Sequence, residues 1–277
     1  MTADSTKRPI EFYGRSLTEL GQRTARRVLG AEACPFLKRR CTKQRKSDPS
    51  QTIGACTVGY GGDTLIICPH RFVERDQVFL DSVRFLQPNL TYFVVPEITV
   101  QGGSVDYFLV GARGDEILDY CGVEIQSLDT TGSGGIWAAR EDLLRGRLGQ
   151  NYPYGINWKM SAKTVLVQMH HKAASFEALG KKLALVMQTK FLDYIRRTFE
   201  TDQLRPAQAS DSVHLHVYDL VALGTDLRLV LTSTLSTDVR GVERMLCLGA
   251  GHEVLEQDVV RQLQSKMPSA RRLKIAH

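Results

Sequence analysis

The sequence contains no long hydrophobic run, because no window approaches the roughly 18 uncharged apolar residues that a membrane-spanning helix requires. The N-terminal segment MTADSTKRPIEFYGRS lacks the apolar stretch of a signal peptide, so we expect a cytoplasmic protein that contacts no membrane. No G-x-x-x-x-G-K-S/T phosphate loop is present, and no action driven by an NTP is expected. Glycine and proline are scattered rather than enriched, which excludes collagen-like and low-complexity chains.

The remaining composition is that of a globular protein. The chain has 277 residues, 43% of them hydrophobic, which suits one large domain or two small ones. Six cysteines in a cytosolic chain should stay reduced. Metal ligation or burial is therefore a better explanation for them than disulfide bonds.

The charge is divided into blocks along the chain. Residues 1–50 hold 12 Lys and Arg against 5 Asp and Glu, and residues 140–200 hold 11 against 5. Residues 51–139, which lie between them, hold 4 against 11. Basic blocks offer contacts to a polyanion such as DNA, and carboxylates are the natural ligands of Mg²⁺. Ordinary patches of solvated surface charge explain the same blocks equally well.

The apolar patterning predicts an α/β (α+β) fold, a mixed sheet flanked by helices. A capping box at Ser16 and Glu19 begins a first helix that ends at Gly30, and an irregular stretch follows to about residue 63. Two apolar stretches separated by Gln-Gly-Gly-Ser, and a third after Ala-Arg-Gly-Asp, predict an antiparallel meander. The expected strands are 65–68, 90–100, 105–110, 117–126, 183–187, 213–221 and 227–235, and helices are expected near 79–86, over most of 138–199 and at 254–266.

Two carboxylates and one amide form the pattern with the clearest chemical meaning. Glu124 and Gln126 are residues i and i+2 of a strand, so they project from the same face. Asp106 begins the neighbouring strand, where the meander can bring its carboxylate beside Glu124. Two converging carboxylates can hold Mg²⁺, which activates water and neutralises charge on an attacked phosphate, while Gln126 could orient that water. The alternative is a half-solvated strand with polar residues at alternate positions.

Four of the six cysteines fall within 35 consecutive residues: Cys34, Cys41, Cys56 and Cys68. An even spread would place fewer than one cysteine in such a window. Four thiolates suit a tetrahedral site for Zn²⁺ or a single iron, which would organise the irregular segment. The C-x₆-C-x₁₄-C-x₁₁-C spacing lacks a C-x₂-C pair, so buried free thiols remain the alternative. Cys121 and Cys247 have apolar neighbours and are expected in the core.

Basic and polar residues near these motifs are candidates for DNA contacts. The loop after the third meander strand either contacts a DNA groove or is a plain turn. The basic residues near 160 either position the DNA backbone or lie beside a helix cap. Residues around the second cysteine suit DNA phosphates, and their arginines can also bond guanine edges. The candidates are Lys38, Arg39, Arg40, Lys43 and Arg45 near the cysteine, Ser127, Asp129 and Thr130 in the loop, and Lys159 and Lys163 beyond it.

Three stretches carry a resemblance to a known family. PEITVQGGSVDYFLV followed by CGVEIQSLDTTGSGG, together with NYPYGINWKMSAKTVLVQMHHKA and the four cysteines, resembles the NotI-type restriction endonucleases over most of residues 16–200. These enzymes belong to the PD-(D/E)xK superfamily but replace its lysine with glutamine. The resemblance implies that Asp106 and Glu124 bind the catalytic metal and that Gln126 stands in place of the lysine. Glu97 lies in a matching stretch, where it either assists the metal site or is a surface carboxylate.

The resemblance also implies that the four cysteines bind one iron near the DNA; from the residues alone, iron and zinc both stay open. It predicts a Mg²⁺-dependent type II restriction endonuclease that makes double-strand cuts at a GC-rich palindrome. A homodimer would match the two-fold symmetry of such a site. We expect residues 1–70 to form an N-terminal helix and metal-binding module, and residues 71–277 to form the nuclease core with a C-terminal extension. The alternatives are a structure-specific repair or recombination nuclease, and a non-catalytic DNA-binding regulator built around the cysteine module.

Overall fold

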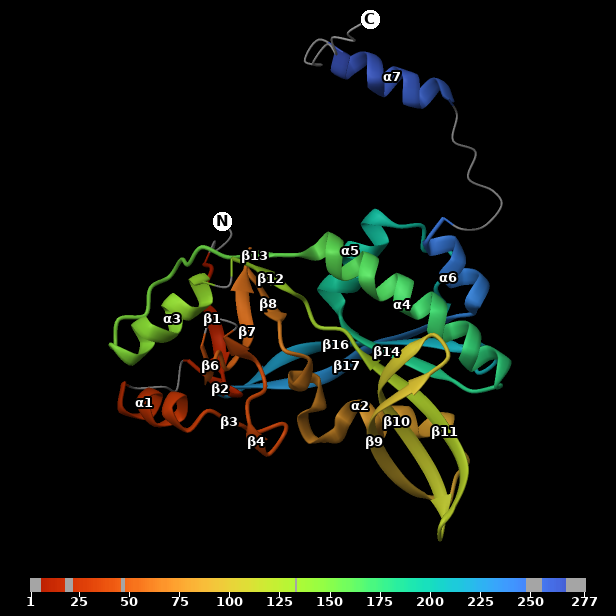
Figure 1. The fold of residues 1–277 in the computed structure, drawn as a ribbon, viewed down its shortest axis with the longest axis horizontal. Helices are drawn as coiled ribbons and strands as arrows, with labels where there is room; N and C mark the ends of the chain where they lie inside the picture. Colours follow the sequence, from red (N-terminus) through yellow and green to blue (C-terminus); the bar gives the residue numbers. More distant parts are fainter. Residues whose placement is uncertain (1–5, 18–21, 46–47, 133, 248–255, 268–277) are drawn as a thin grey trace, which may run out of the picture.

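A seven-stranded mixed sheet carries most of the helices of the protein (Figure 1). The structure is a computed structural model, and it describes residues 6–17, 22–45, 48–132, 134–247 and 256–267. The strand order across the sheet is β15-β17-β16-β14-β11-β10-β9. Its strands are β9 (Thr91–Val100), β10 (Gly103–Arg113), β11 (Glu116–Ile125), β14 (Leu183–Gln188), β15 (Arg205–Pro206), β16 (Val213–Leu223) and β17 (Asp226–Thr237).

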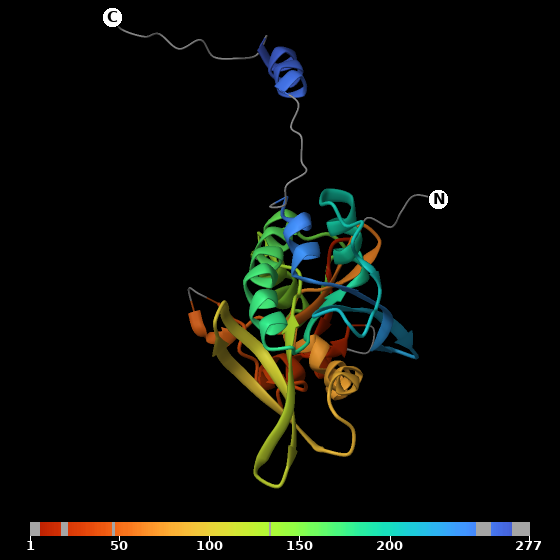
Figure 2. The same ribbon diagram turned by 90° about the vertical axis from the view of Figure 1, so that its right-hand side faces the viewer.

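The sequence-based prediction of an antiparallel meander is confirmed. β9 pairs antiparallel with β10, and β10 pairs antiparallel with β11. The next two pairings, β11 with β14 and β14 with β16, are parallel. Parallel neighbours need long crossover connections, and the helices fill these: α3 (Gly134–Leu144) and α4 (Trp158–Ala178) precede β14, and α5 (Thr189–Thr198) precedes β16. The end of the meander that carries the β10–β11 turn projects away from the helices (Figures 1 and 2).

The sheet separates two hydrophobic clusters. On one face, Phe176 of α4 and Phe191 of α5 pack with Leu185 of β14. On the other face, Phe79 of α2 (Gln77–Ser82) packs with Val123 of β11. The remaining helices are η1 (Pro69–Asp76), η2 (Val83–Phe85), α6 (Val239–Met245) and α7 (Glu256–Lys266). The helices predicted near 79–86 and 254–266 are thus present, the first as α2 followed by the short η2.

The prediction of an irregular stretch up to residue 63 is wrong. This stretch contains the strands β3 to β7, and β7 joins a second sheet with order β2-β1-β7-β8. Its strands are β1 (Pro9–Phe12), β2 (Arg15–Ser16), β7 (Ala55–Tyr60) and β8 (Asp63–Ile66), and the short pairs β3 (Ala33–Cys34) with β4 (Arg39–Arg40) and β5 (Gln44–Arg45) with β6 (Asp48–Thr52) lie beside it. A last pair joins β12 (Thr130–Thr131) to β13 (Gly155–Ile156).

The predicted capping box at Ser16 is also wrong, because Ser16 lies in β2 and pairs with Glu11 of β1. Its partner Glu19 lies outside the described residues. The first helix, α1, spans Gln22–Ala31. Strands β1 and β2 have only four and two residues, which is too short for a clear period-2 signal, so the cap pattern was the stronger local signal.

A buried charge network joins the second sheet to the β16–β17 hairpin. The Arg71 guanidinium donates to Glu11 at 2.9 Å and to Glu74 at 2.8 Å, and Glu74 also accepts from Arg228 at 2.9 Å. A buried pair of this kind costs about 3–5 kcal/mol of stability when one partner is removed. One hydrophobic cluster also contains both Phe12 of β1 and residues of α4. A division at residue 70 stays a prediction.

Candidate functional site

The two predicted carboxylates lie together at a small hollow between the meander and α4. The hollow has a volume of about 170 Å³, and Asp106 of β10 and Glu124 of β11 both line it. The Asp106 carboxylate accepts a hydrogen bond of 2.8 Å from the backbone N–H of Ile125, which fixes it beside the end of β11. Glu124 is only 8% exposed, whereas Asp106 is exposed. We call this cavity the acidic hollow.

A lysine that the sequence analysis did not single out completes the acidic hollow. Lys172 of α4 is 4% exposed, and its Nζ lies 2.5 Å from Oε1 of Glu124. On the face of α4 that borders the hollow, Lys172 lies one helical turn from Met169 and two turns from Val165. The sequence signal that could have identified Lys172 is its position within the apolar stripe of a helix. A buried ammonium needs a buried partner of opposite charge.

The electrostatics of Glu124 reflect this environment. Burial, and then the charge of the nearby Asp106 carboxylate, raise the pKa of Glu124 to about 7. The Lys172 ammonium acts in the opposite direction through its hydrogen bond and its charge. A buried carboxylate with a raised pKa and a specific charged partner in a cavity is typical of functional sites.

Gln126 borders the same hollow, as predicted, although it lies just beyond the last residue of β11. Its backbone N–H donates to the carbonyl of Val186 at 2.9 Å, so the strand pairing continues through it. Its side-chain amide donates to the carbonyl of Ser127 at 2.6 Å. Two further polar residues, Ser104 and Gln168, also line the hollow. The hollow therefore offers oxygen ligands and hydrogen-bonding groups around one small space.

Glu97 lies across the β9–β10 ladder from Asp106. The pairs Ile98 with Val105 and Pro96 with Tyr107 flank this position on both sides. Glu97 itself has a φ of 50°, in the left-handed region that a non-glycine residue rarely adopts within a strand. Such local strain is concentrated at functional sites. Glu97 is exposed, so both readings of it, as a helper of the metal site and as a surface carboxylate, stay open.

A larger cleft of about 680 Å³ connects the carboxylates to the cysteine segment. Asp106 lines both this cleft and the acidic hollow, whereas Glu97 lines the cleft alone. Leu37 and Arg39 of the cysteine segment also line it, together with His70 beyond the fourth cysteine. We call this the outer cleft. A cationic side chain and two carboxylates thus border one cleft.

The four clustered cysteines are all buried and act on one another. A hydrogen bond from the Cys56 thiol, helped by the Lys43 ammonium, lowers the pKa of Cys68 to about 7. Burial raises the pKa of Cys34 and of Cys41, and the charge of Cys68 adds to both effects. Among the residues that the structure describes, no three His, Cys, Asp or Glu side chains form a group that could hold a metal ion. The thiols are thus neighbours that surround Cys68, without a ready-made site.

The basic candidates near the second cysteine divide into two groups. Lys38 and Arg39 are exposed, and Lys38 has a φ of 53° at the turn between β3 and β4. Arg40 is exposed as well, but its guanidinium and the ammonium of the half-buried Lys43 are engaged by groups of the protein. The guanidinium of Arg40 bonds Glu32 and the carbonyl of Ser50, and the ammonium of Lys43 donates to the carbonyl of Ile67 at 2.6 Å. The side chain of Arg45 lies outside the described residues.

The loop after β11 is held against the start of α4. The N–H of Asp129 donates to the hydroxyl of Ser161 at 3.4 Å, and its carbonyl accepts from the N–H of Asn157 at 2.8 Å. Asp129 is exposed, and Ser127 and Thr130 are partly exposed. The exposed Lys159 and Lys163 lie on the first turns of α4. These candidates share one region, and their contact with DNA stays a prediction.

The two remaining cysteines have different surroundings. Cys121 is fully buried in the core, as predicted. The same prediction for Cys247 is wrong, because this residue is exposed. It follows α6 with a φ of 58°, the left-handed conformation that commonly ends a helix, and this position leaves the core.

Comparison with known proteins gives no match: no family model fits the chain, and no curated protein matches it significantly. Within the described residues, no helix is both long and apolar enough to cross a membrane. The chemistry of the acidic hollow and the resemblance of its motifs therefore carry the functional proposal.

Proposed function

We propose that the protein is a Mg²⁺-dependent endonuclease that cuts double-stranded DNA at a specific sequence, in the manner of a type II restriction enzyme with a PD-(D/E)xK core. The observation that carries the proposal is the convergence of Asp106, Glu124 and Lys172 on one polar hollow that opens toward the outer cleft. Lys172 lies 66 positions from Asp106 and 48 from Glu124 in the sequence, and the fold brings the three residues together from two strands and a helix.

The donor chemistry of the acidic hollow fits Mg²⁺, since Asp106 and Glu124 supply carboxylate oxygens in a space about the size of an ion with its waters. A bound Mg²⁺ would supply stabilisation of the negative charge that develops on the attacked phosphate. Gln126 is a neutral group that can orient water by hydrogen bonding. Lys172 holds the Glu124 carboxylate in place and acts as a positioning residue.

Lys172 also bears on the substitution of glutamine for lysine at position 126. In this proposal the positive charge that residue 126 lacks is delivered to the hollow from α4. The charge remains within contact distance of a metal-binding carboxylate, although it arrives from a different element of the fold. The presence of glutamine at position 126, where the PD-(D/E)xK superfamily has lysine, is then compatible with an active nuclease.

Product analysis separates this proposal from the repair or recombination nuclease. The purified protein would be incubated with linear duplex DNA, and with branched and flapped DNA of the same sequence, in Mg²⁺ and in EDTA. A restriction enzyme gives fragments of fixed length from the linear duplex in Mg²⁺ alone. Cleavage confined to junctions or flaps contradicts the restriction activity and supports the repair enzyme.

The third candidate is a non-catalytic DNA-binding regulator in the cytoplasm, which would use the exposed Lys38 and Arg39 of the cysteine segment to contact phosphates. It predicts binding of duplex DNA without cleavage in any divalent cation.

A homodimer on a palindromic, GC-rich site is part of the enzyme proposal. Sedimentation of the complex with a cleaved duplex tests it, and one protein chain per duplex contradicts it.

We also propose that the four clustered cysteines bind one structural metal ion, iron or zinc, beside the outer cleft. Cys68 and the three buried thiols that interact with it, Cys34, Cys41 and Cys56, are the donor set that such an ion prefers. Because no described group is ready to hold an ion, the sulfur atoms must draw together when it binds.

Elemental analysis of protein purified without added metal tests the cysteine site. We expect about one equivalent of iron or zinc per chain, and loss of this metal in Cys41→Ser, because structural sites of this kind need all four ligands. Cys121→Ser, a buried cysteine outside the cluster, is the matched control and should retain the metal. Metal-free wild-type protein, or retention of the metal in Cys41→Ser, contradicts the site.

A further inference from the structure

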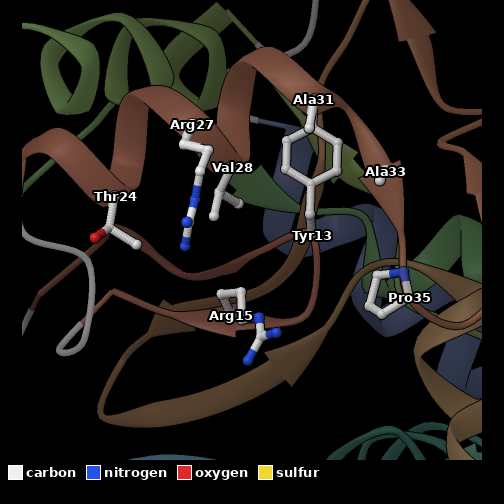
Figure 3. Close-up of a pocket in the computed structure, with 8 residues that line it drawn as sticks. All are labelled: Tyr13, Arg15, Thr24, Arg27, Val28, Ala31, Ala33 and Pro35. Carbon is white, nitrogen blue, oxygen red and sulfur yellow. The ribbon is translucent and has the colours of Figure 1, made fainter.

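A second hollow, with two arginines on its rim, lies on the N-terminal part of the molecule. Its volume is about 550 Å³, and it lies between α1 and the β1–β2 strands. Arg27 extends from α1 toward the strand that carries Arg15 at the opposite rim (Figure 3). The ring of Tyr13 and the small residues Ala33 and Pro35 form apolar walls (Figure 3). We call this cavity the arginine hollow.

Both arginines are exposed, and in the described part of the chain no hydrogen bond or ion pair engages either guanidinium. Neighbouring arginines differ in this respect. Arg26 donates to the carbonyl of Leu144 at 3.3 Å, and Arg140 donates to that of Leu29 at 3.1 Å. Two exposed guanidinium groups that line one cavity repel each other, and a phosphate that accepts bidentate hydrogen bonds from them offsets this repulsion.

One short hairpin contributes different residues to the arginine hollow and to the outer cleft. This β3–β4 hairpin, residues 33–40, presents Pro35 to the arginine hollow and Leu37 and Arg39 to the outer cleft. Its place is fixed by Gly14, where an added Cβ would lie 2.7 Å from Pro35 and 2.9 Å from Phe36. Gly14 also has a φ of 67°, so no other residue suits this close approach.

We propose that the arginine hollow binds the phosphodiester backbone of double-stranded DNA, on the strand opposite to the one held at the carboxylates. This inference rests on the proposed nuclease function and identifies how the duplex is held. The major groove of DNA admits a two-stranded β-ribbon, and its two walls are the backbones of the two strands. When the β3–β4 hairpin enters the groove, one backbone faces the outer cleft and the other faces Arg15 and Arg27. The apolar walls then lie against deoxyribose.

The test is DNA binding by the full chain in EDTA, measured by fluorescence anisotropy over a range of salt concentrations. The probes are a GC-rich duplex and one of its strands alone. We expect the double variant Arg15→Ala/Arg27→Ala to bind the duplex roughly tenfold or more weakly, and the slope of log K against log salt to fall by about 1 to 2. Affinity for the single strand should change by less than about threefold, because the second backbone is absent.

The matched control is Arg113→Ala/Arg240→Ala, which removes two exposed arginines from β10 and α6. It should bind the duplex within about twofold of the wild type. Equal losses in both double variants would show a non-specific charge effect and overturn the proposal. The variant Arg15→Lys/Arg27→Lys keeps the charge without the bidentate geometry and should bind with intermediate affinity.

Failure of this inference is distinguishable from failure of the proposed function. If the wild type binds the duplex and Arg15→Ala/Arg27→Ala binds it equally well, only the arginine hollow is excluded. If the wild type binds no DNA, both proposals fail. If inorganic phosphate or a mononucleotide at micromolar concentration displaces the duplex only in proteins with both arginines, the hollow is a site for small anions and the backbone proposal is overturned.

Discussion

Asp106→Asn is expected to abolish DNA cleavage while duplex binding persists. The substitution removes one negative charge from the acidic hollow, and the asparagine amide oxygen can still accept the hydrogen bond from the Ile125 N–H. Loss of a metal ligand forfeits several kcal/mol of transition-state stabilisation, so we expect the single-turnover cleavage rate to fall by at least about 1000-fold. Binding in EDTA should change by less than about threefold, since phosphate contacts to basic residues dominate affinity.

The matched control for this substitution is Asp115→Asn, which removes the same charge from the exposed turn between β10 and β11. It should cleave at the wild-type rate. Thermal unfolding of both variants checks that the fold survives. Cleavage by Asp106→Asn within tenfold of the wild type would exclude this carboxylate as a metal ligand.

Lys172→Met is expected to lower the cleavage rate by about 100-fold at saturating Mg²⁺. Methionine approximates the length of the lysine stem, so packing on α4 is retained while the ammonium within 2.5 Å of Glu124 is lost. Removal of one positioned charge or donor from a catalytic site typically costs 100-fold or more. Single-turnover kinetics should show the loss in the cleavage step, with duplex affinity unchanged. Lys172→Arg, which keeps the charge, should recover part of the rate.

Lys190→Met provides the control for loss of an ion-paired lysine. Lys190 lies 2.9 Å from Asp63 on the surface, where such pairs contribute little. The rate of Lys190→Met should therefore equal that of the wild type. An unchanged rate in Lys172→Met would reduce Lys172 to a structural partner of Glu124, and a loss in DNA affinity alone would contradict its assignment to the cleavage step.

Much of the main sheet could be predicted from the sequence, because its strands are long and bounded by strong turn signals. The meander from Thr91 to Ile125 has glycine-rich turns at 101–103 and 113–115, and both turns appear in the structure. The second sheet could not be predicted in this way. Its strands β1 and β2 pair across the Tyr13–Gly14 turn, and β1 also pairs with β7 about 45 residues further along the chain. Local patterns contain no information about that distant partner.

The candidate site shows the same division. Asp106 and Glu124 could be placed together because neighbouring meander strands have a restricted register. Lys172 could not be placed, since its approach depends on how α4 packs across the sheet. Gly102 is part of that packing, because an added Cβ would lie 2.6 Å from the carbonyl oxygen of His171. The bonds that engage Arg40 and Lys43 within the protein likewise depend on tertiary contacts.

Digestion of a large, GC-rich DNA of known sequence, with Mg²⁺ and with EDTA, tests the central claim most directly. A sequence-specific endonuclease produces discrete fragments in Mg²⁺ alone, and the mapped ends of those fragments give the recognition site and the cut position. Asp106→Asn, treated in the same way, should leave the DNA intact. Retained DNA binding without discrete fragments in Mg²⁺ would contradict the claim and assign the protein to the regulator or to the structure-specific nuclease.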